Sequence, residues 1–269
     1  MQDNLFFFES TESERQKSAT KPQGRKKKST KAAQPVIEKN SGFSDCDQLF
    51  QICQSIDLFL TDSDKKNTSK KNHTPDEYKK FVSSIYSGYL KIDEQDPVWK
   101  LLKYLEEKTD FFYAPASTQY HGSVQCGLVK HSLFVLYWCL KLGSVMLPAV
   151  PNYTHLATAS LFHDLCKVNM YEEKTRNVKD EKTGRWEAVP CYRVREDYTV
   201  LGHGIESLSR LNEFVKLPTC WQYAVRFHMG AYDCSPSDLI SLNKATRKYS
   251  EVLLLHTADM QASLLEDCA

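Results

Sequence analysis

Two adjacent residues, His163 and Asp164, interrupt an otherwise apolar stretch of the chain at residues 157–168. Burial of an unpaired carboxylate costs on the order of several kcal/mol, so Asp164 needs a partner that neutralises its charge. On a helix, Lys167 follows His163 by four residues and Asp164 by three, so the three side chains are expected to share one face. Such a face carries a metal-ligand pair and a cation beside it, where the phosphate of a substrate would bind.

The same kind of interruption recurs in other apolar helical runs or at their edges, at His131, His203, His228 and Asp259. Imidazoles and carboxylates in this ratio suit Mn²⁺, Fe²⁺, Co²⁺, Ni²⁺ or Zn²⁺ rather than Ca²⁺. Four histidines and two aspartates can hold two ions, with Asp164 as the bridging ligand. Two ions roughly 3.5–4 Å apart activate a water molecule as the nucleophile and clamp a phosphoryl oxygen. The sequence therefore predicts a site for one or two metal ions inside a helix bundle.

A hydrogen-bonded core histidine is the alternative interpretation for any one of these positions taken alone. His73, His155 and His256 are assigned to that ordinary role, although His256 precedes Asp259 by three residues and could support it as a neighbour of the ligands. Only the full set favours a metal site.

Composition excludes several classes of protein. The chain has 269 residues, 41% of them hydrophobic, and a net charge of +1, so no global field draws it to nucleic acid or a membrane. No run of about 18 apolar residues predicts a membrane span, and the first residues lack the pattern of a signal peptide. Nine cysteines without a C-x-x-C pair do not suggest a disulfide framework. We expect a cytoplasmic protein with no membrane partner.

Hydropathy patterning predicts an all-α protein in three parts. Residues 1–43 are polar and basic and are predicted to be a disordered arm, because they offer too few apolar anchors to offset the entropy of ordering. Residues 44–95 are predicted to form helices that are either an accessory layer or part of the main fold. Residues 96–269 are predicted to form the main helical domain. Its helices are expected at about 125–143, 153–168, 203–216, 219–229, 236–245 and 247–266.

Residues 171–200 break the helical rhythm and predict a β-hairpin, with a turn at Lys182–Arg185, between the segments that carry His163 and His203. Arg176 and Trp186 lie on this hairpin. An arginine pairs with phosphate and a tryptophan stacks on a base, so we expect these two side chains to bind substrate if the hairpin overhangs the metal site. The alternative is a solvated insertion.

Five segments together resemble one known family. Residues 116–132, A-S-T-Q-Y-H-G-S-V-Q-C-G-L-V-K-H-S, are similar to the S-T-x-Y-H-G-x-x-x-G-G-L-x-x-H-S segment of a bacterial and phage-borne group of HD-domain metal-dependent phosphohydrolases. The later segments Phe162–Asn169, Gly202–Gly204, Arg226–Gly230 and Leu254–Asp259 continue the resemblance, which covers roughly residues 96–265. It extends to the HD portion of certain bacterial 3′–5′ exoribonucleases. Cys126 departs from the pattern, because the group usually has glycine at this position.

The resemblance implies an all-α HD-domain helical bundle with a β-hairpin insertion. It implies that one ion is held by His131, His163, Asp164 and Asp259, and that a second ion is held with the help of His203 and His228. Lys167 is implied to aid catalysis at the phosphate, with Tyr120 and His121 as further candidates for substrate binding. The implied activity is hydrolysis of a nucleotide or other phosphate ester, including a short nucleic acid, by a metal-activated hydroxide. The alternatives are a 3′–5′ exonuclease on single strands and a non-catalytic regulatory protein that only binds the metal.

The first residues carry one more short motif. Gln2, Leu5 and Phe6 match the Q-x-x-L-F peptide that bacterial proteins insert into the DNA sliding clamp. Exposed apolar anchors on such an arm can fill a pocket of a partner, so the clamp is a candidate partner. A chance match of three positions is the alternative.

Overall fold

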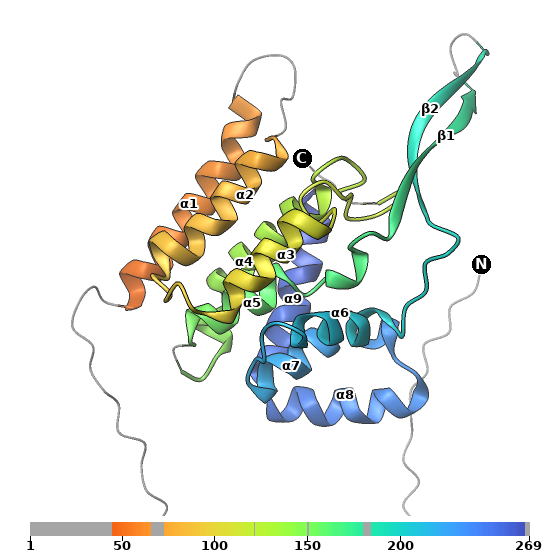
Figure 1. Ribbon diagram of the computed structural model, residues 1–269. Helices are drawn as coiled ribbons and strands as arrows, with labels where there is room; N and C mark the ends of the chain where they lie inside the picture. The colour runs from red at the N-terminus through yellow and green to blue at the C-terminus, as the bar shows by residue number, and fades with distance from the viewer. Residues whose placement is uncertain (1–44, 66–72, 121, 150, 180–183, 267–269) are drawn as a thin grey trace, which may run out of the picture. The chain divides into compact units, whose positions relative to one another are not determined.

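The computed structural model describes residues 45–65, 73–120, 122–149, 151–179 and 184–266 (Figure 1). These residues belong to one compact unit, residues 42–269. In it, helices and a two-stranded antiparallel hairpin confirm the predicted mostly-α class with a β insertion, whereas the HD fold itself stays a prediction. The elements are α1 (Asp45–Lys65), α2 (Pro75–Ser84), α3 (Pro97–Lys108), α4 (Gly127–Met146), α5 (Tyr153–Leu161), β1 (Tyr171–Lys179), β2 (Trp186–Val194), α6 (His203–Asn212), α7 (Thr219–Arg226), α8 (Pro236–Lys248) and α9 (Ser250–Glu266), with a π-helical turn at Ile85–Tyr89 and 3₁₀ turns at Leu165–Lys167 and Gly230–Asp233.

Several helices begin where the sequence carries a start signal. Thr74 caps α2 and forms a reciprocal capping box with Glu77, with Pro75 at the first helical position. Asp96 accepts a hydrogen bond from the Val98 amide at the start of α3. In each case the side chain satisfies a backbone N–H group that has no partner within the helix.

Helix α4 is the centre of the core. It packs against α1, α5 and α9, and α7 packs against both α5 and α9. Buried residues of α1, such as Ile52 and Ile56, belong to the same apolar cluster as Leu133 and Leu136 of α4. The helices at residues 45–95 are therefore part of the main fold and not a separate layer. The predicted arm at residues 1–43, with the Gln2–Leu5–Phe6 motif, lies outside the described residues.

Helix α4 is also long and apolar enough to span a membrane by length and composition, and no other helix among the described residues meets that test. Just over half of its apolar window, 56%, is buried inside the protein. The helix carries His131 on its buried side, so its apolar character has an explanation in the packing of the bundle.

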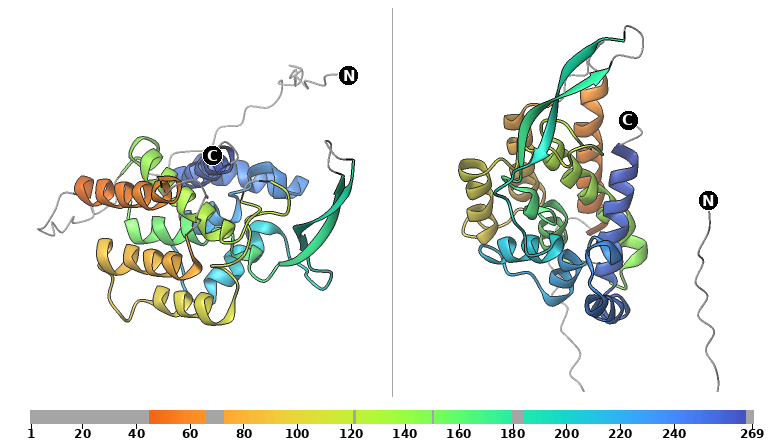
Figure 2. Two further views of the ribbon diagram at one scale, coloured as in Figure 1. Left: turned by 90° about the horizontal axis from the view of Figure 1, so that it is seen from above. Right: turned by 90° about the vertical axis from the view of Figure 1, so that its right-hand side faces the viewer.

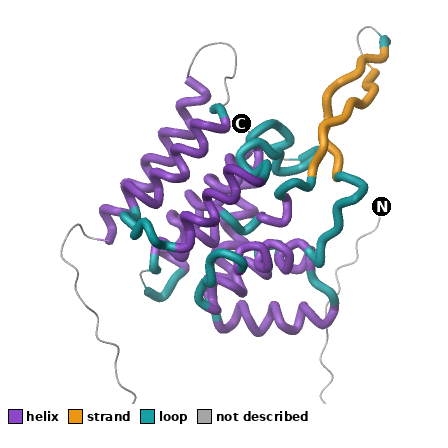
Figure 3. Tube along the Cα trace, in the orientation of Figure 1, coloured by secondary structure: helices purple, strands orange, loops and turns teal. Residues whose placement is uncertain are grey.

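The hairpin projects away from the helices (Figures 1, 2 and 3). Beyond Glu172, every described residue of β1 is exposed. The strand register pairs Arg176 with Val189 and Lys179 with Trp186. Because opposite residues share a face and successive residues alternate, Arg176 and Trp186 lie on opposite faces of the hairpin.

A pair of substitutions on α1 tests whether this helix belongs to the cooperative core. Ile56 is fully buried and Leu58 is 56% exposed on the same helix. Ile56→Ala should lower the free energy of unfolding by about 2–5 kcal/mol, because it leaves a cavity against α4. Leu58→Ala should change it by less than about 0.5 kcal/mol. Urea denaturation of the whole chain measures both values, and equal effects would place α1 outside the core.

Candidate metal centre

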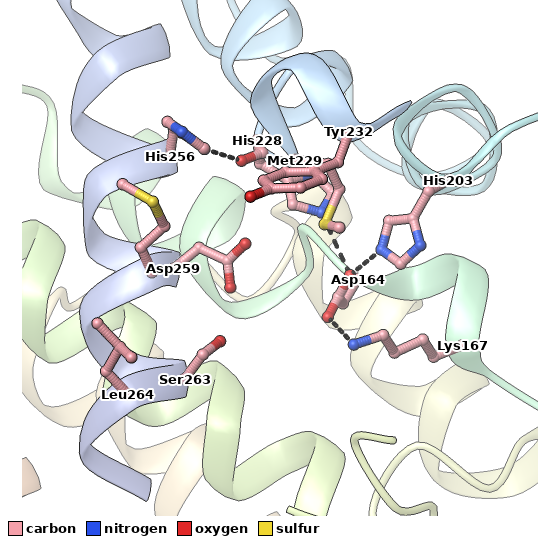
Figure 4. A pocket seen from close by; sticks show the side chains of 11 residues that line it. Asp164, Lys167, His203, His228, Met229, Tyr232, His256, Asp259, Ser263 and Leu264 are labelled. Atoms are coloured by element: carbon pink, nitrogen blue, oxygen red, sulfur yellow. Dashed lines mark hydrogen bonds and ion pairs between the residues drawn. The ribbon is translucent and has the colours of Figure 1, made fainter. Parts of the chain in front are cut away.

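The Asp164 carboxylate lies at the middle of the predicted cluster, and its two oxygens face different partners (Figure 4). Oδ1 lies 2.5 Å from Nε2 of His203 and 3.3 Å from Nε2 of His228. Oδ2 lies 3.4 Å from Nε2 of His163 and 2.8 Å from Nζ of Lys167. A carboxylate with separate imidazoles at each oxygen has the arrangement of a bridging ligand.

Asp259 of α9 and His131 of α4 complete the cluster on the Oδ2 side. Nε2 of His131 lies 3.1 Å from Oδ1 of Asp259 and 3.9 Å from Oδ2 of Asp164. Nε2 of His163 lies 3.8 Å from Oδ1 of Asp259. The predicted ligands thus converge from separate elements onto one point, which was the geometric requirement for a single centre.

Subsets of this cluster bring their ligand atoms within 4.8 Å of one another and could hold a metal ion. They are His131, His163 and Asp164, and also His163, His228 and Asp259. A further subset combines Asp164 and His203 with Cys166, which the sequence analysis did not consider. Burial raises the pKa of the Cys166 thiol to about 12, so the thiol is a weaker candidate than the imidazoles.

Two of the imidazoles are held so that Nε2, the nitrogen that a metal would bind, faces the cluster. Nδ1 of His163 donates to the Ser160 carbonyl over 2.8 Å, and Nδ1 of His228 donates to the Val225 carbonyl over 2.7 Å. With Nδ1 hydrogen-bonded to the backbone, Nε2 is the ring nitrogen that each histidine turns toward Asp164. Both Nε2 atoms are buried and accept no hydrogen bond, a costly arrangement that a bound metal ion would explain.

Both histidines follow the end of a helix in the same way. Helix α5 ends at Leu161 and α7 ends at Arg226, and each is followed by Phe and then His. Phe162 has φ −120° and ψ 20°, and Phe227 has φ −114° and ψ 19°. In each case the histidine Nδ1–H then satisfies a carbonyl of the last helical turn. The helix end therefore fixes the direction of each Nε2.

The predicted C-terminal ends of the helices at 153–168 and 219–229 were wrong, because both helices end before their histidine. His163 and Asp164 lie in a turn between α5 and a 3₁₀ turn, and His228 lies beyond the end of α7. The predicted proximity of Lys167 and Asp164 nevertheless holds, because the 3₁₀ turn also brings the side chain three residues ahead close to Asp164. His203 is the first residue of α6, as predicted.

The charges of the cluster stabilise one another. Burial disfavours the Asp164 carboxylate, but Lys167 and the neighbouring His163 and His203 hold the pKa of this group well below its usual range. Burial likewise disfavours the charged form of Lys167, yet Asp164 raises the pKa of the ammonium. The pKa of Asp259 is also lowered, against the effect of burial, by the histidines around it. Burial lowers the pKa of His163 and favours its neutral, metal-binding form.

Two glycines and Asp233 place His203 beside Asp164. Gly202 has φ +114°, a conformation that favours glycine, and a Cβ on Gly204 would lie 2.1 Å from the Arg226 carbonyl oxygen. Oδ1 of Asp233 accepts from the His203 amide over 3.1 Å, and Oδ2 accepts from the Gly204 amide over 2.9 Å. Asp233 therefore caps α6 from a distant 3₁₀ turn. Local sequence around His203 gives no signal of this contact.

Arg210 of α6 holds the segment that follows Asp164. Its Nη1 donates to the carbonyls of Leu165 and Val168, both over 3.1 Å. Its Nη2 donates to the Tyr198 hydroxyl over 3.0 Å, and that hydroxyl donates to the Cys166 carbonyl. One guanidinium and one phenol thus bind three of the four carbonyls of residues 165–168, which fixes the backbone between Asp164 and the hairpin.

A cavity of about 330 Å³ opens onto the cluster (Figure 4). It is lined by Asp164, Lys167, His203, His228, Met229, Tyr232, His256, Asp259, Met260, Ser263 and Leu264. The residues from α9 follow helical spacing, 256, 259, 260, 263 and 264, so the position of Asp259 could have identified them. Nδ1 of His256 donates to the His228 carbonyl over 2.6 Å, which is the ordinary hydrogen-bonded role expected for it, and its support of Asp259 stays a prediction. Tyr232 and Met229 carried no sequence signal.

The other predicted substrate contacts are not among the residues that line this cavity. Arg176 lines a separate hollow of about 710 Å³, together with Gln119 and Tyr192. Trp186 is 69% exposed on the projecting hairpin, and Tyr120 is 76% exposed. His121 lies outside the described residues. Roles for these side chains in substrate binding remain predictions.

A glycine substitution tests how His203 is placed. Gly204→Ala should push α6 away from α7, weaken metal binding by removing His203 from Asp164, and destabilise the fold by about 1–3 kcal/mol. The control is Gly88→Ala, because a Cβ at Gly88 has no atom within 4 Å. Metal titration and urea denaturation of both variants provide the comparison. Wild-type metal affinity in Gly204→Ala would contradict the expected displacement.

A pair of arginine substitutions tests the support of the Asp164 turn. Arg210→Ala should weaken metal affinity about 10- to 100-fold, the range seen when residues that orient metal ligands are removed. Arg210→Lys should not restore it, because one ammonium cannot reproduce the forked hydrogen bonds. Arg195→Ala is the matched control, since the Arg195 guanidinium is 45% exposed and bonds to Asp197. Equal affinity in all three variants would remove Arg210 from the site.

No family model, no curated protein and no solved structure matches the chain. The functional interpretation of the metal centre therefore depends on its own residues and on the motifs in the sequence.

Proposed function

We propose that the protein is a metal-dependent phosphohydrolase that acts on a nucleotide or another phosphate ester. The observation that carries this proposal is the pair of buried Nε2 atoms, on His163 and His228, that have no hydrogen-bond partner and face a buried carboxylate with a lysine at its side. Nitrogen and oxygen donors of this kind fit a divalent transition metal such as Mn²⁺, Fe²⁺, Co²⁺, Ni²⁺ or Zn²⁺.

The donor set favours two ions. His131, His163 and Asp259 lie toward Oδ2 of Asp164, whereas His203 and His228 lie toward Oδ1. A single ion would leave one of these two groups of donors without a cation. When bound, a pair of ions would supply a water nucleophile of lowered pKa and positive charge for the phosphoryl oxygens.

Lys167 has the position of a group that binds phosphate. Its Nζ lies 2.8 Å from Asp164 and its side chain is 12% exposed at the wall of the cavity. The raised pKa of Lys167 keeps the ammonium charged throughout the neutral range. One ammonium can therefore hold Asp164 on one side and an oxygen of the phosphoryl group on the other, where negative charge develops during hydrolysis.

The same residues are compatible with a 3′–5′ exonuclease on single strands and with a regulatory protein that binds metal without turnover. Asp259, Asp164 and Lys167 all face the cavity and are held by charge pairs, which favours an enzyme over a binder. The products distinguish the two activities. Hydrolysis of a single ester releases one phosphate or one alcohol from a small substrate, whereas an exonuclease releases successive mononucleotides from a single strand.

The proposal is tested by metal analysis combined with hydrolysis. The purified protein should contain a divalent transition metal, and it should hydrolyse bis-p-nitrophenyl phosphate or a nucleoside monophosphate with added Mn²⁺. Asp164→Ala should lose metal and activity together. Lys167→Ala should keep its metal, but its turnover should fall on the order of 10²–10³-fold because it loses a group that stabilises charge. Lys103→Ala, at a 72% exposed lysine, is the control.

Each outcome has a definite interpretation. Metal content of wild type without turnover of any ester or short strand would favour the regulatory alternative. A protein that binds no transition metal at micromolar concentration would remove the proposed function altogether.

A further inference from the structure

The mouth of the cavity gathers large apolar side chains that are open to solvent. Tyr232 is 90% exposed, Leu264 is 64% exposed and Met260 is 44% exposed, and Met229 lines the cavity beside them. Figure 4 shows the Tyr232 ring extending from its turn toward the side of Asp259, next to Met229. Exposed groups of this kind around one opening mark a binding surface rather than a solvated face. We refer to these four residues as the apolar rim.

The chemistry of the apolar rim favours a flat aromatic ligand. A phenol ring offers a stacking surface, and the thioethers of Met229 and Met260 make favourable contacts with aromatic rings. Stacking on a single exposed ring is effective for any nucleobase, because every base has an aromatic face.

The charge of the cavity limits the number of phosphates. Among the described residues that line it, Lys167 is the one lysine or arginine, and the lining also holds two carboxylates, Asp164 and Asp259. The proposed metal ions would bind the phosphoryl group that reacts, and beyond them these lining residues offer no second positive side chain for the further phosphates of a polyphosphate. The volume of about 330 Å³ is also at the small end of the roughly 300–1,000 Å³ of ligand pockets.

We propose that the cavity selects an ester with one phosphoryl group and one aromatic group the size of a nucleobase, with the aromatic ring stacked on Tyr232. This inference rests on the proposed function, because it assigns the phosphoryl end to the metal centre. Tyr232 and Met260 then determine specificity, and they bind the part of the substrate that does not react.

The experiment measures binding to the metal-loaded full chain by calorimetry. The probes resist hydrolysis, because methylene groups replace the ester oxygen and any oxygen that bridges two phosphorus atoms. They are the phosphonate analogue of adenosine monophosphate, the corresponding ribose phosphonate without a base, and the analogue of adenosine triphosphate with methylene groups at the ester position and at both bridging positions. Wild type should bind the adenosine phosphonate more tightly than the ribose phosphonate, and should bind the triphosphate analogue no more tightly than the adenosine phosphonate.

Tyr232→Ala should weaken binding of the adenosine phosphonate about 5- to 150-fold, the range expected for loss of one stacked base. It should leave the affinity for the ribose phosphonate unchanged, and Tyr232→Phe should restore base binding. Met260→Ala should weaken base binding in the same direction. Leu253→Ala is the matched control, because Leu253 is 47% exposed on the same helix but does not line the cavity.

Two results would overturn the inference. One is that Tyr232→Ala binds the adenosine phosphonate as tightly as wild type. The other is that the triphosphate analogue binds more than tenfold tighter than the adenosine phosphonate. These outcomes differ from a failure of the proposed function, since base binding through Tyr232 without turnover of any ester would contradict hydrolysis alone.

Discussion

The charge of one buried carboxylate constrains the arrangement around it. Asp164 is 2% exposed, and its charge survives burial because an ammonium and several imidazoles surround it. Lys167 and His163 are close to Asp164 in the chain, whereas His203 comes from α6, so the low pKa of the carboxylate depends partly on α6 being in place. Removing one partner of a buried charge typically costs about 3–5 kcal/mol, so the cluster links the stability of the bundle to the integrity of the site.

The sequence predicted which side chains gather in the cluster better than it predicted the backbone that carries them. The apolar spacing around His163 continues through Leu165 and Val168, which is why a helix to residue 168 was expected. In the structure the helix stops at Leu161, because the histidine takes over a carbonyl of the last turn and the following residues wind into 3₁₀ geometry. Apolar periodicity reports burial, and a buried turn has the same apolar content as a buried helix.

The residues that the sequence did not predict share one property, which is that their partners are distant in the chain. Asp233 caps a helix that begins thirty residues earlier, and Arg210 binds carbonyls more than forty residues before it. Tyr232 lies within the 3₁₀ turn Gly230–Asp233, which has no strong local signal. Motifs that act within one turn, such as the capping box at Thr74 and the hairpin flanks, were predictable because their cause is local.

The two helix ends at His163 and His228 have an electrostatic consequence as well. The C-terminal end of an α-helix carries about half a negative charge, spread over its last carbonyl groups. Helices α5 and α7 both end beside a histidine of the cluster, so the backbone itself adds negative potential next to the atoms that would bind the metal. Cation affinity should therefore persist in part when a single imidazole is removed. The main-chain dipoles would attract any cation to the cluster, whereas the side-chain ligands would determine which metal ion is bound selectively.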